Sequence, residues 1–394
     1  MNPACDILVV GGGVAGLPAA VAAARTGAHV VLVEKSGFLG GAGVAALHRH
    51  VCGLYPNGGT KPRETLNAGL TREIVSILAA LSPSNRPIQM GRVWVLPFEP
   101  AHLRSVYESV ARDEQNLAVL FSSAVKSVAC DGRHITGIDV RTPDASLKLH
   151  PAAVIDATGS GEIIRLSGAP FELAPGPERQ LAGCSLHIGG IEGDRELLGV
   201  KMAWALSRLP ADETRDLPLF ASFSPGSADD DGFGKFSLPP SPESQDPVVL
   251  NGHLDRLHAL LATHLPELAH SRILARSPRM EREGLRLAGR WELDEASLLA
   301  ACKFPDAVAR SAWPIEFWDP SGTAPRLAYP PDGDYADIPA RCLRSRTIAN
   351  LFATGRCISA SSRALASTRV MGTCMALGEA AGWQAARSVN RQPP

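Results

Sequence analysis

The hydrophobic pattern of the first 34 residues predicts a strand, a helix and a second strand in close succession. Four apolar residues at 7–10 precede the glycine-rich loop Gly11–Gly16, an alanine-rich stretch runs on to Gly27, and a second apolar run at 30–33 leads to Glu34. A glycine loop between a strand and a helix, with an acidic residue about 20 positions further on, is typical of a dinucleotide-binding βαβ unit.

Three glycines of this loop have distinct expected roles. Gly11 permits a tight turn, Gly13 lets the backbone approach a pyrophosphate, and Gly16 lets the helix pack on the strand. The helix would present free N–H groups and partial positive charge to phosphates, while Glu34 would accept hydrogen bonds from ribose hydroxyls. The alternative is a strand–loop–helix that binds nothing. Three glycines, each costing about 0.5–1 kcal/mol in regular structure, argue against that alternative.

Further along the chain, apolar periodicity predicts two helices and then a run of short strands. The helices span about 63–82 and 100–114, and the strands cover 117–121, 124–129, 134–141 and 152–159. The second and third strands are joined by a turn signal and form a small β-meander, and the last strand ends in Ala-Thr-Gly. This order resembles the FAD-binding domain of flavoproteins more than a nicotinamide dehydrogenase, whose strands and helices would keep alternating.

The middle of the chain has a different pattern. A strand is expected at 185–188 and helices at about 195–209 and 255–265, and the stretch 224–247, rich in Ser, Pro, Asp and Gly, is predicted to be a surface loop, with a lid as the alternative. We therefore predict an α/β fold in which an inserted α+β domain interrupts a Rossmann-like FAD-binding domain with a parallel sheet and a β-meander. The FAD-binding domain comprises 1–50, 101–168 and 330–394, and the substrate or cap domain comprises 51–100 and 169–329.

Composition narrows the function. The formal net charge of the 394 residues is −1, which does not suggest a nucleic acid or an anionic membrane as partner. No run of 18 apolar residues is present, so no membrane span is expected. The eight cysteines include no C-x-x-C pair, which argues against a metal site and a dithiol centre, and a reducing cytoplasm is the simplest location.

Motifs from both ends of the chain belong together. They are Gly11–Gly16, Glu34–Gly41, Asp156–Gly159, Thr354–Ser359 and Ser367–Met371. With them in view, nearly the whole chain resembles the FAD-dependent oxidoreductases that are distantly related to fumarate reductase and succinate dehydrogenase flavoprotein subunits. The resemblance implies FAD and a small organic substrate. The residues expected to contact FAD are Gly11, Gly13, Val14, Ala15, Gly16, Glu34, Lys35, Gly40, Gly41, Ala42, Val125, Ala157, Thr158, Gly159, Gly355, Arg356, Arg369, Met371, Gly372 and Thr373.

The start of the C-terminal helix suits a flavin. A reduced flavin carries negative charge near N1 and O2, and Arg369 together with the free N–H groups of Met371, Gly372 and Thr373 would stabilise that charge. The alternative is an amphipathic helix that packs on the sheet, and the buried face of the helix must do this in either case.

The unusual run His48–Cys52 is one candidate for chemistry. His48, His50 and Cys52 alternate along a predicted strand and would face the same side. An imidazole near the flavin would serve as a base or proton shuttle, and a histidine or cysteine here would also be able to tether the flavin covalently. The alternative is a polar loop that faces solvent or a domain interface.

Arg282, Glu283 and Arg286 are the second candidate. An arginine would clamp a substrate carboxylate while Glu283 accepts a proton. The alternative is a helix-spaced pair of arginines that forms salt bridges with Glu281 or Glu283 on the surface.

These observations predict an FAD-dependent oxidoreductase that transfers hydride between a small organic substrate and the flavin. The alternatives are a flavin monooxygenase or oxidase that uses oxygen, and a flavin-binding protein without turnover. No second glycine fingerprint marks a nicotinamide domain, so the sequence does not name the electron acceptor or donor.

Overall fold

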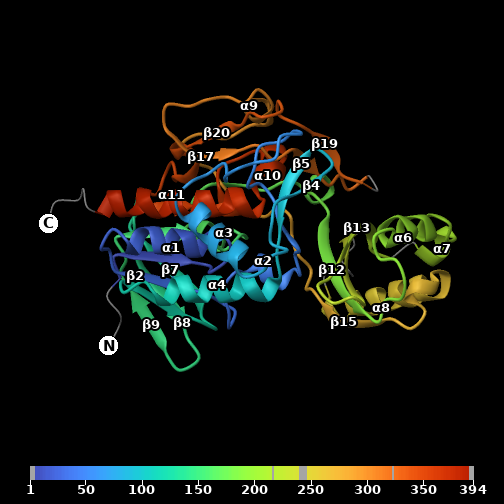
Figure 1. Cartoon of the computed structure of the whole chain (residues 1–394). Coiled ribbons are helices and arrows are strands. Elements are labelled where there is room, and N and C mark those ends of the chain that lie inside the picture. The colour runs from blue at the N-terminus through green and yellow to red at the C-terminus, as the bar shows by residue number, and fades with distance from the viewer. Residues whose placement is uncertain (1–4, 215–216, 239–245, 322–323, 390–394) are drawn as a thin grey trace.

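A computed structural model describes residues 5–214, 217–238, 246–321 and 324–389. Its centre is a five-stranded parallel sheet in the order β21-β10-β1-β2-β6 (Figure 1). The strands are β1 (Ile7–Val10), β2 (Val30–Val33), β6 (Leu117–Leu120), β10 (Ala153–Asp156) and β21 (Leu351–Ala353). Four of them, β1, β2, β10 and β21, are buried throughout, as expected for strands covered on both faces. Along β1, Ile7 and Val9 join the hydrophobic core on one face, while Leu8 and Val10 join the core on the other.

The first and last helices cross closely on one face of this sheet. Helix α1 (Gly16–Ala24) is buried along its whole length and packs against α11 (Met371–Val389). A Cβ atom at Gly378 would lie 2.0 Å from the Ala15 carbonyl oxygen, and one at Gly382 would lie 2.2 Å from that of Ala19. Only glycine allows this approach, which brings the two ends of the chain into one structural unit.

Helices α3 (Leu70–Ala80) and α4 (Pro100–Arg112) cover the same core. The prediction for α4 is confirmed, whereas the helix expected from about residue 63 begins only at Leu70. Gly69 precedes it with φ +64°, and the Glu379 carboxylate accepts a hydrogen bond of 2.9 Å from the Leu70 N–H. A residue from the opposite end of the chain therefore fixes where this helix starts.

The other face of the sheet carries an antiparallel meander of β7 (Ala124–Cys130), β8 (Ile135–Arg141) and β9 (Ser146–Leu149). The first two strands were predicted and the third was missed. Short helix α5 (Glu162–Leu166) follows β10 and contacts both β10 and β7.

Residues 182–276 form a second sheet with its own hydrophobic core, which we call the cap sheet. Its order is β13-β14-β12-β15, with β12 (Ala182–Gly189), β13 (Leu219–Pro225), β14 (Asp231–Leu238) and β15 (Arg272–Arg276). Helices α6 (Leu198–Ser207), α7 (Ala211–Thr214) and α8 (Pro247–His264) lie on the side of this sheet away from the parallel sheet (Figure 1). Of the residues that the structure describes, none before Ala182 belongs to this core.

The prediction of a surface loop or lid at 224–247 is wrong for its central part. Strand β14 occupies Asp231–Leu238, is mostly buried and pairs with both β12 and β13. Its glycines gave the segment a loop-like composition, but Gly232 lies where a Cβ would be 2.2 Å from the Phe223 ring. Residues 239–245 of the predicted loop lie outside the described residues. Helix α8 is also longer than predicted, because it begins at Pro247 behind an Asp246 N-cap.

The remaining elements of the described chain are short. They are α2 (Ala42–Ala45), β3 (His50–Val51), β4 (Ile88–Met90), β5 (Val93–Pro97), β11 (Phe171–Glu172), β16 (Arg286–Leu287), α9 (Glu295–Leu299), β17 (Ala307–Ser311), β18 (Ile315–Phe317), β19 (Arg326–Ala328), β20 (Ala336–Pro339) and α10 (Ser362–Thr368). Strand β3 pairs with β5, and β18 pairs with β19. These two small sheets bring residues 48–52 and 315–318 to the region between the parallel sheet and the cap sheet.

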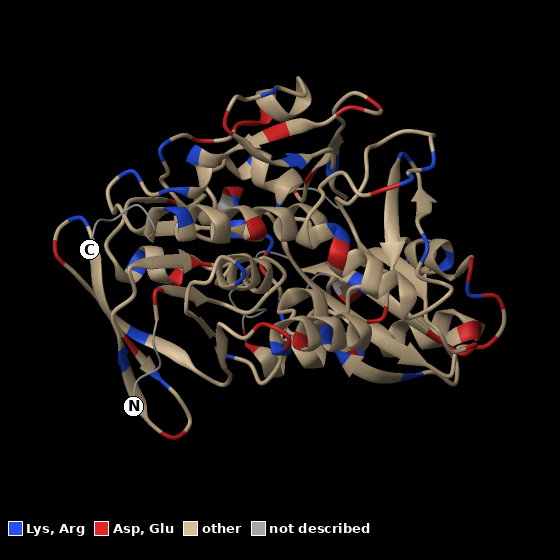
Figure 2. Cartoon of the chain, turned by 60° about the vertical axis from the view of Figure 1, so that its left-hand side comes forward, with Lys and Arg blue, Asp and Glu red and all other residues tan. Residues whose placement is uncertain are grey.

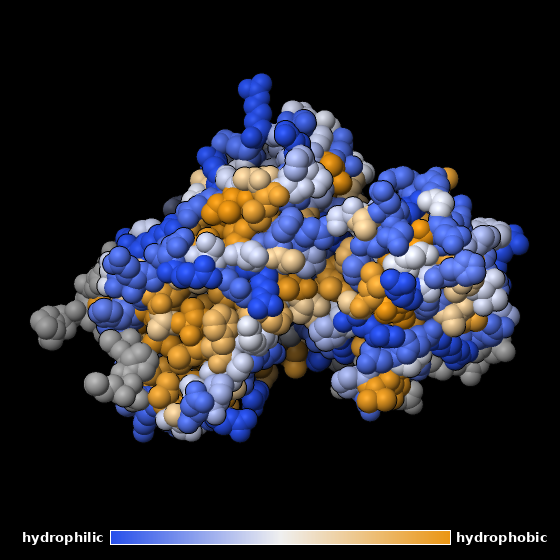
Figure 3. Space-filling model, turned by 60° about the horizontal axis from the view of Figure 1, so that its bottom comes forward, coloured by the Kyte–Doolittle hydropathy of each residue, from blue (hydrophilic) through white to orange (hydrophobic). Residues whose placement is uncertain are grey.

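The predicted fold class is confirmed: a Rossmann-like α/β unit with a parallel sheet and a meander carries an additional α+β part. In the view of Figure 2, acidic and basic residues are interspersed around the molecule. On the face shown in Figure 3, apolar residues form separate patches among hydrophilic ones. Among the described residues, no helix is long and apolar enough to cross a membrane.

Candidate active site

Two glycines of the glycine-rich loop are required by close packing, and a third, Gly13, is not. A Cβ at Gly11 would lie 2.6 Å from the Ala157 carbonyl oxygen, and one at Gly16 would lie 1.7 Å from that of Gly11. At Gly13, in contrast, the nearest atom to an added Cβ is the Cα of Gly41, 3.9 Å away. Gly13 therefore borders open space, which is the arrangement that a pyrophosphate needs for close approach to the backbone.

The second glycine pair completes this cradle. Gly13 and Gly40 form a parallel bridge, and a Cβ at Gly41 would lie 2.8 Å from the Gly13 Cα. Ala42 then opens helix α2. Ala15 precedes α1, and Val14 packs on the main core.

Glu34 holds the loop from the next strand. It is 5% exposed, and its two carboxylate oxygens accept hydrogen bonds from the N–H groups of Gly12 (2.6 Å) and Ser36 (2.7 Å). A carboxylate has about four lone-pair positions, so two remain for ribose hydroxyls. Lys35 is exposed, and Val125 is buried at the start of β7.

The Ala157–Gly159 and Gly355–Arg356 segments meet beside the loop. The Arg356 guanidinium lies over Gly159, and its Nε donates to the Gly159 carbonyl oxygen at 3.3 Å. The Thr158 hydroxyl donates to Asp156 and accepts from three N–H groups at the start of α5. A cofactor contact at Thr158 would therefore come from its backbone.

The start of α11 differs from the prediction in one respect. The Gly372 N–H is not free, because it donates to the Cys52 carbonyl oxygen at 2.8 Å. A Cβ at Gly372 would lie 2.7 Å from the backbone of Gly53, so this glycine serves close packing of residues 52–53 on the helix. Nearby, the Thr373 hydroxyl and the Arg369 Nε are buried without a hydrogen-bond partner. Orphaned polar atoms beside a glycine cradle fit a bound flavin dinucleotide.

Titratable side chains from four separate segments lie close enough to Arg369 and to one another for electrostatic interaction. His48 and His50 come from the segment entering β3, Lys235 from β14 of the cap sheet, Arg282 from the loop before β16, and Glu316 from β18. The electrostatic influence of Lys235, Arg369 and Arg282 reaches both His48 and Glu316. We call His48, His50, Lys235, Arg282, Glu316 and Arg369 the junction cluster, because it lies where the cap sheet meets the parallel-sheet unit.

The glycine-rich loop around Gly13 is accounted for by the protein family to which the chain belongs. A family model described as FAD dependent oxidoreductase matches residues 6–230 and 243–393. The chain belongs to this family of FAD-dependent oxidoreductases. It is therefore an enzyme that uses FAD, as predicted. A search of curated proteins gives no match.

Solved structures support the fold. The Diels-Alderase PyrE3 of pyrroindomycin biosynthesis has a TM-score of 0.52 and 15% identity, over 98% of this chain and 67% of its own. BexE, connected with oxidation during BE-7585A biosynthesis, has a TM-score of 0.52 and 12% identity over 99% and 64%, and AlpK has 0.52 and 13% over 100% and 64%. The chain thus spans about two thirds of the length of these proteins. At such low identity the likeness shows the shared fold.

For an FAD-dependent oxidoreductase, the protonation of the junction cluster matters. Burial and the neighbouring cation Lys235 lower the pKa of His48 well below its ordinary value and that of His50 to about 4. Both imidazoles are neutral at pH 7. Burial raises the pKa of Cys52 to about 12, which keeps its thiol protonated.

Glu316 remains charged within the cluster. Burial opposes its ionisation, but Arg369 and Lys235 bring its pKa below the ordinary value. Its carboxylate accepts hydrogen bonds from the indole N–H groups of Trp318 (3.0 Å) and Trp313 (3.3 Å). Arg369 donates to the Glu316 backbone carbonyl oxygen at 3.1 Å.

Only one member of the second predicted group joins the cluster. Arg282 stacks on the Trp318 ring at 4.2 Å. Glu283 is instead 1% exposed, accepts from the Gln180 N–H at 3.0 Å and the Ser362 hydroxyl, and lies 3.5 Å from Arg286. The alternative of a helical pair on the surface is wrong, because Arg286 is buried in strand β16.

Lys235 and Glu316 are the residues that sequence reasoning missed as site residues. Lys235 lay within a segment assigned to a loop. Glu316 lies in an apolar segment between Trp313 and Trp318 that the sequence analysis did not single out. A lysine or glutamate flanked by aromatic residues in a strand is the signal that would have drawn attention to both. Among the described residues, no group of three or more His, Cys, Asp or Glu side chains is placed to hold a metal ion.

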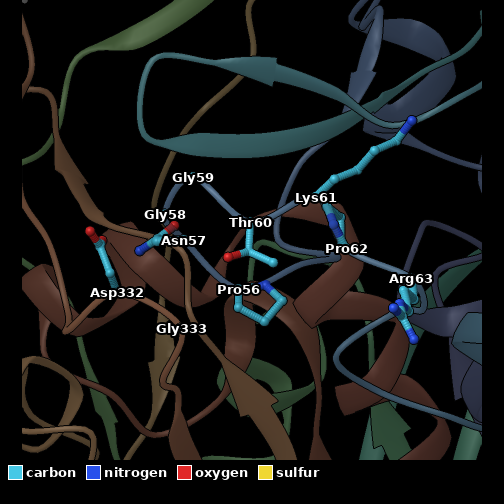
Figure 4. Close-up of a pocket in the computed structure, with 10 residues that line it drawn as sticks. All are labelled: Pro56, Asn57, Gly58, Gly59, Thr60, Lys61, Pro62, Arg63, Asp332 and Gly333. Carbon is cyan, nitrogen blue, oxygen red and sulfur yellow. The ribbon is translucent and has the colours of Figure 1, made fainter.

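A surface pocket of about 480 Å³ lies apart from the cluster (Figure 4). It is lined by residues 56–63, which follow β3, and by Asp332 and Gly333. No junction-cluster residue lines it. The titratable groups that influence one another therefore lie in the junction cluster and not at this pocket.

Replacing Arg369 with methionine is expected to make the midpoint potential of the bound flavin more negative. Losing one charge-assisted interaction of about 1–3 kcal/mol with the reduced anion corresponds to roughly 20–65 mV for a two-electron couple. Spectroelectrochemical titration of the purified holoprotein measures this shift. Arg369→Lys should recover part of it, and an unchanged potential in Arg369→Met would mean that the side chain does not face the ring.

Proposed function

We propose that this enzyme transfers hydride between a small organic substrate and FAD at the junction cluster. The observation that carries the proposal is the convergence of His48, His50, Lys235, Arg282, Glu316 and Arg369 beside the start of α11. Ligand sites in enzymes are favoured at boundaries between structural units, and strongly perturbed titratable groups favour a functional assignment.

FAD, when bound, supplies the hydride acceptor or donor, and the chain supplies position and proton control. The residues fit the group, because the Gly13 cradle and Glu34 suit its pyrophosphate and ribose, and Arg369 with Thr373 suits the ring. His48 and His50, neutral at pH 7, are proposed to accept the substrate proton as hydride leaves. Glu316 is proposed to keep Arg369 in place, since it remains ionised and fixed by two indoles.

The proposal also covers the domain bounds, the cellular location and the roles of Glu283 and Arg286. The division into an FAD-binding domain (1–50, 101–168 and 330–394) and a cap domain (51–100 and 169–329) stays a proposal. The separate core within 182–273 supports it for that part of the cap, whereas Val51 and Leu54 pack in the core of the parallel-sheet unit. The relationship to fumarate reductase subunits stays a prediction, as does the electron partner. A cytoplasmic location is proposed from eight free cysteines. Glu283 and Arg286 are proposed to hold the loop of Arg282, not to react.

An anaerobic substrate screen tests the function. The purified holoprotein is mixed with small alcohols, amines and organic acids, or, in its chemically reduced form, with unsaturated acceptors, while the visible absorbance of oxidised flavin is recorded. Bleaching or recovery of this absorbance by one compound is the expected result. Re-oxidation with and without oxygen then separates an oxidase or monooxygenase from a dehydrogenase. A flavin whose redox state no compound changes would favour the non-catalytic alternative.

The stability of the protein is expected to fall on mild acidification because of the cluster histidines. The pKa of His50 is about 4 in the folded chain, against about 6.5 when unfolded. The unfolded chain thus binds more protons between these values, so the free energy of unfolding decreases as pH falls from about 6.5 towards 4. Urea unfolding at several pH values should show a shallower decrease for His50→Gln than for wild type. The exposed His134→Gln is the control, and an equal slope in all three proteins would contradict this account.

A further inference from the structure

The inner face of the cap sheet points at the junction cluster. Side chains alternate along a strand, and on β14 the buried Phe236 packs into the cap core with α6 and α8. Phe233, Lys235 and Ser237 therefore lie on the opposite face. Phe233 confirms the direction of this face, because it stacks on His187 with ring centroids 4.1 Å apart and lies 4.7 Å beneath the guanidinium of Arg49, next to His48 in the chain.

The cluster carries more positive than negative charge. Its cations are Lys235, Arg282 and Arg369, and its one carboxylate is Glu316. A reduced flavin anion beside Arg369 would offset a second positive charge. One cation remains uncompensated, which matches a ligand with a single negative charge.

Hydrogen bonding identifies Lys235 as that cation. Arg282 donates to the carbonyl oxygens of Leu181 and Ala182 and to the Ser237 hydroxyl at 3.0 Å. Arg369 donates to the carbonyl of Glu316. Within the described part of the chain, the Lys235 ammonium has neither a hydrogen bond nor an ion pair, although the side chain is half-buried and burial lowers its pKa. An unpaired ammonium in such surroundings costs free energy that a bound anion would recover.

We propose that the substrate is a small monocarboxylate whose carboxylate is bound by Lys235 of the cap sheet. The inference rests on the proposed function and adds the substrate class to it. The carboxylate would sit against the cap sheet, with the reacting carbon turned toward the flavin and toward His48 and His50. The indoles of Trp313 and Trp318 donate to the carboxylate of Glu316, so this anion has hydrogen-bond partners other than the ammonium.

Ligand-induced changes in the flavin spectrum test this inference with simple probes. Benzoate and benzamide, and acetate and acetamide, are pairs of similar shape that differ in charge. Titrations of the oxidised holoprotein are expected to give a dissociation constant at least tenfold lower for one carboxylate than for its amide. In Lys235→Met this ratio should fall to near one, whereas Lys235→Arg should retain part of it. The exposed Lys126→Met should keep the wild-type ratio.

The outcomes separate the inference from the function on which it rests. If each amide binds as well as its carboxylate, or if Lys235→Met keeps the wild-type ratio, the substrate class is wrong while the flavin enzyme stands. If the purified protein carries no reducible flavin, the proposed function fails and the inference fails with it. The comparison of each carboxylate with its amide in the wild-type protein remains decisive even where a Lys235 variant does not fold.

Discussion

Replacing Gly13 with alanine is expected to weaken FAD binding by roughly 100-fold and to leave the apoprotein folded. An added Cβ at this position meets no protein atom closer than 3.9 Å, and the backbone there does not have a positive φ. The methyl group would instead occupy the space needed by the pyrophosphate, and overpacking of this kind costs about 1–3 kcal/mol. Fluorescence titration of the apoprotein with FAD measures the affinity, and circular dichroism and thermal unfolding check the fold.

Two further glycines serve as controls. Gly252→Ala, in helix α8 with no atom within 4 Å of the added Cβ, should leave FAD affinity unchanged. Gly16→Ala should instead destabilise the apoprotein itself, because its Cβ would lie 1.7 Å from the Gly11 carbonyl oxygen. Wild-type affinity in Gly13→Ala would place the pyrophosphate elsewhere.

Replacing Glu34 with alanine is expected to reduce FAD affinity at least tenfold. Each hydrogen bond from a ribose hydroxyl to the carboxylate contributes about 1.5–3 kcal/mol. The substitution also removes the acceptor for the N–H groups of Gly12 and Ser36, so the loop loses its support. Calorimetric titration of the apoprotein with FAD measures the change.

A second substitution separates the two effects. Glu34→Gln keeps the shape and one acceptor oxygen but places an NH₂ group against an N–H donor. It should therefore fall between wild type and Glu34→Ala in affinity. Equal affinity in all three proteins would mean that Glu34 does not contact the ribose and serves only the loop.

The parts of the fold that the sequence predicted correctly depend on local signals. The βαβ unit, helix α4 and strand β10 each have a pattern that is complete within one continuous stretch of the chain, and the structure reproduces them. The later start of α3 was not predictable in this way, because the carboxylate that caps it, Glu379, is 309 residues away from Leu70.

The candidate site likewise contains some residues that the local sequence identified and others that only the tertiary structure brings together. The cofactor motif is local, so Gly13 and Glu34 stood out in the sequence. Lys235 and Glu316 are 81 residues apart in the chain. They can be recognised as site residues only in the folded structure, where they influence each other electrostatically beside Arg369. Glu283 shows the converse, since a carboxylate between two arginines predicted chemistry from the local sequence, whereas the structure adds hydrogen bonds with Gln180 and Ser362 that the sequence did not indicate.

The most direct test of the account is a crystal structure of the yellow holoprotein with FAD bound. The account predicts that the isoalloxazine ring lies between the start of α11 and residues 48–53, with Arg369 near its N1 and O2 edge and Lys235 facing the open side of the ring. A ring that lies against residues 56–63, or anywhere out of contact with the junction cluster, would contradict it.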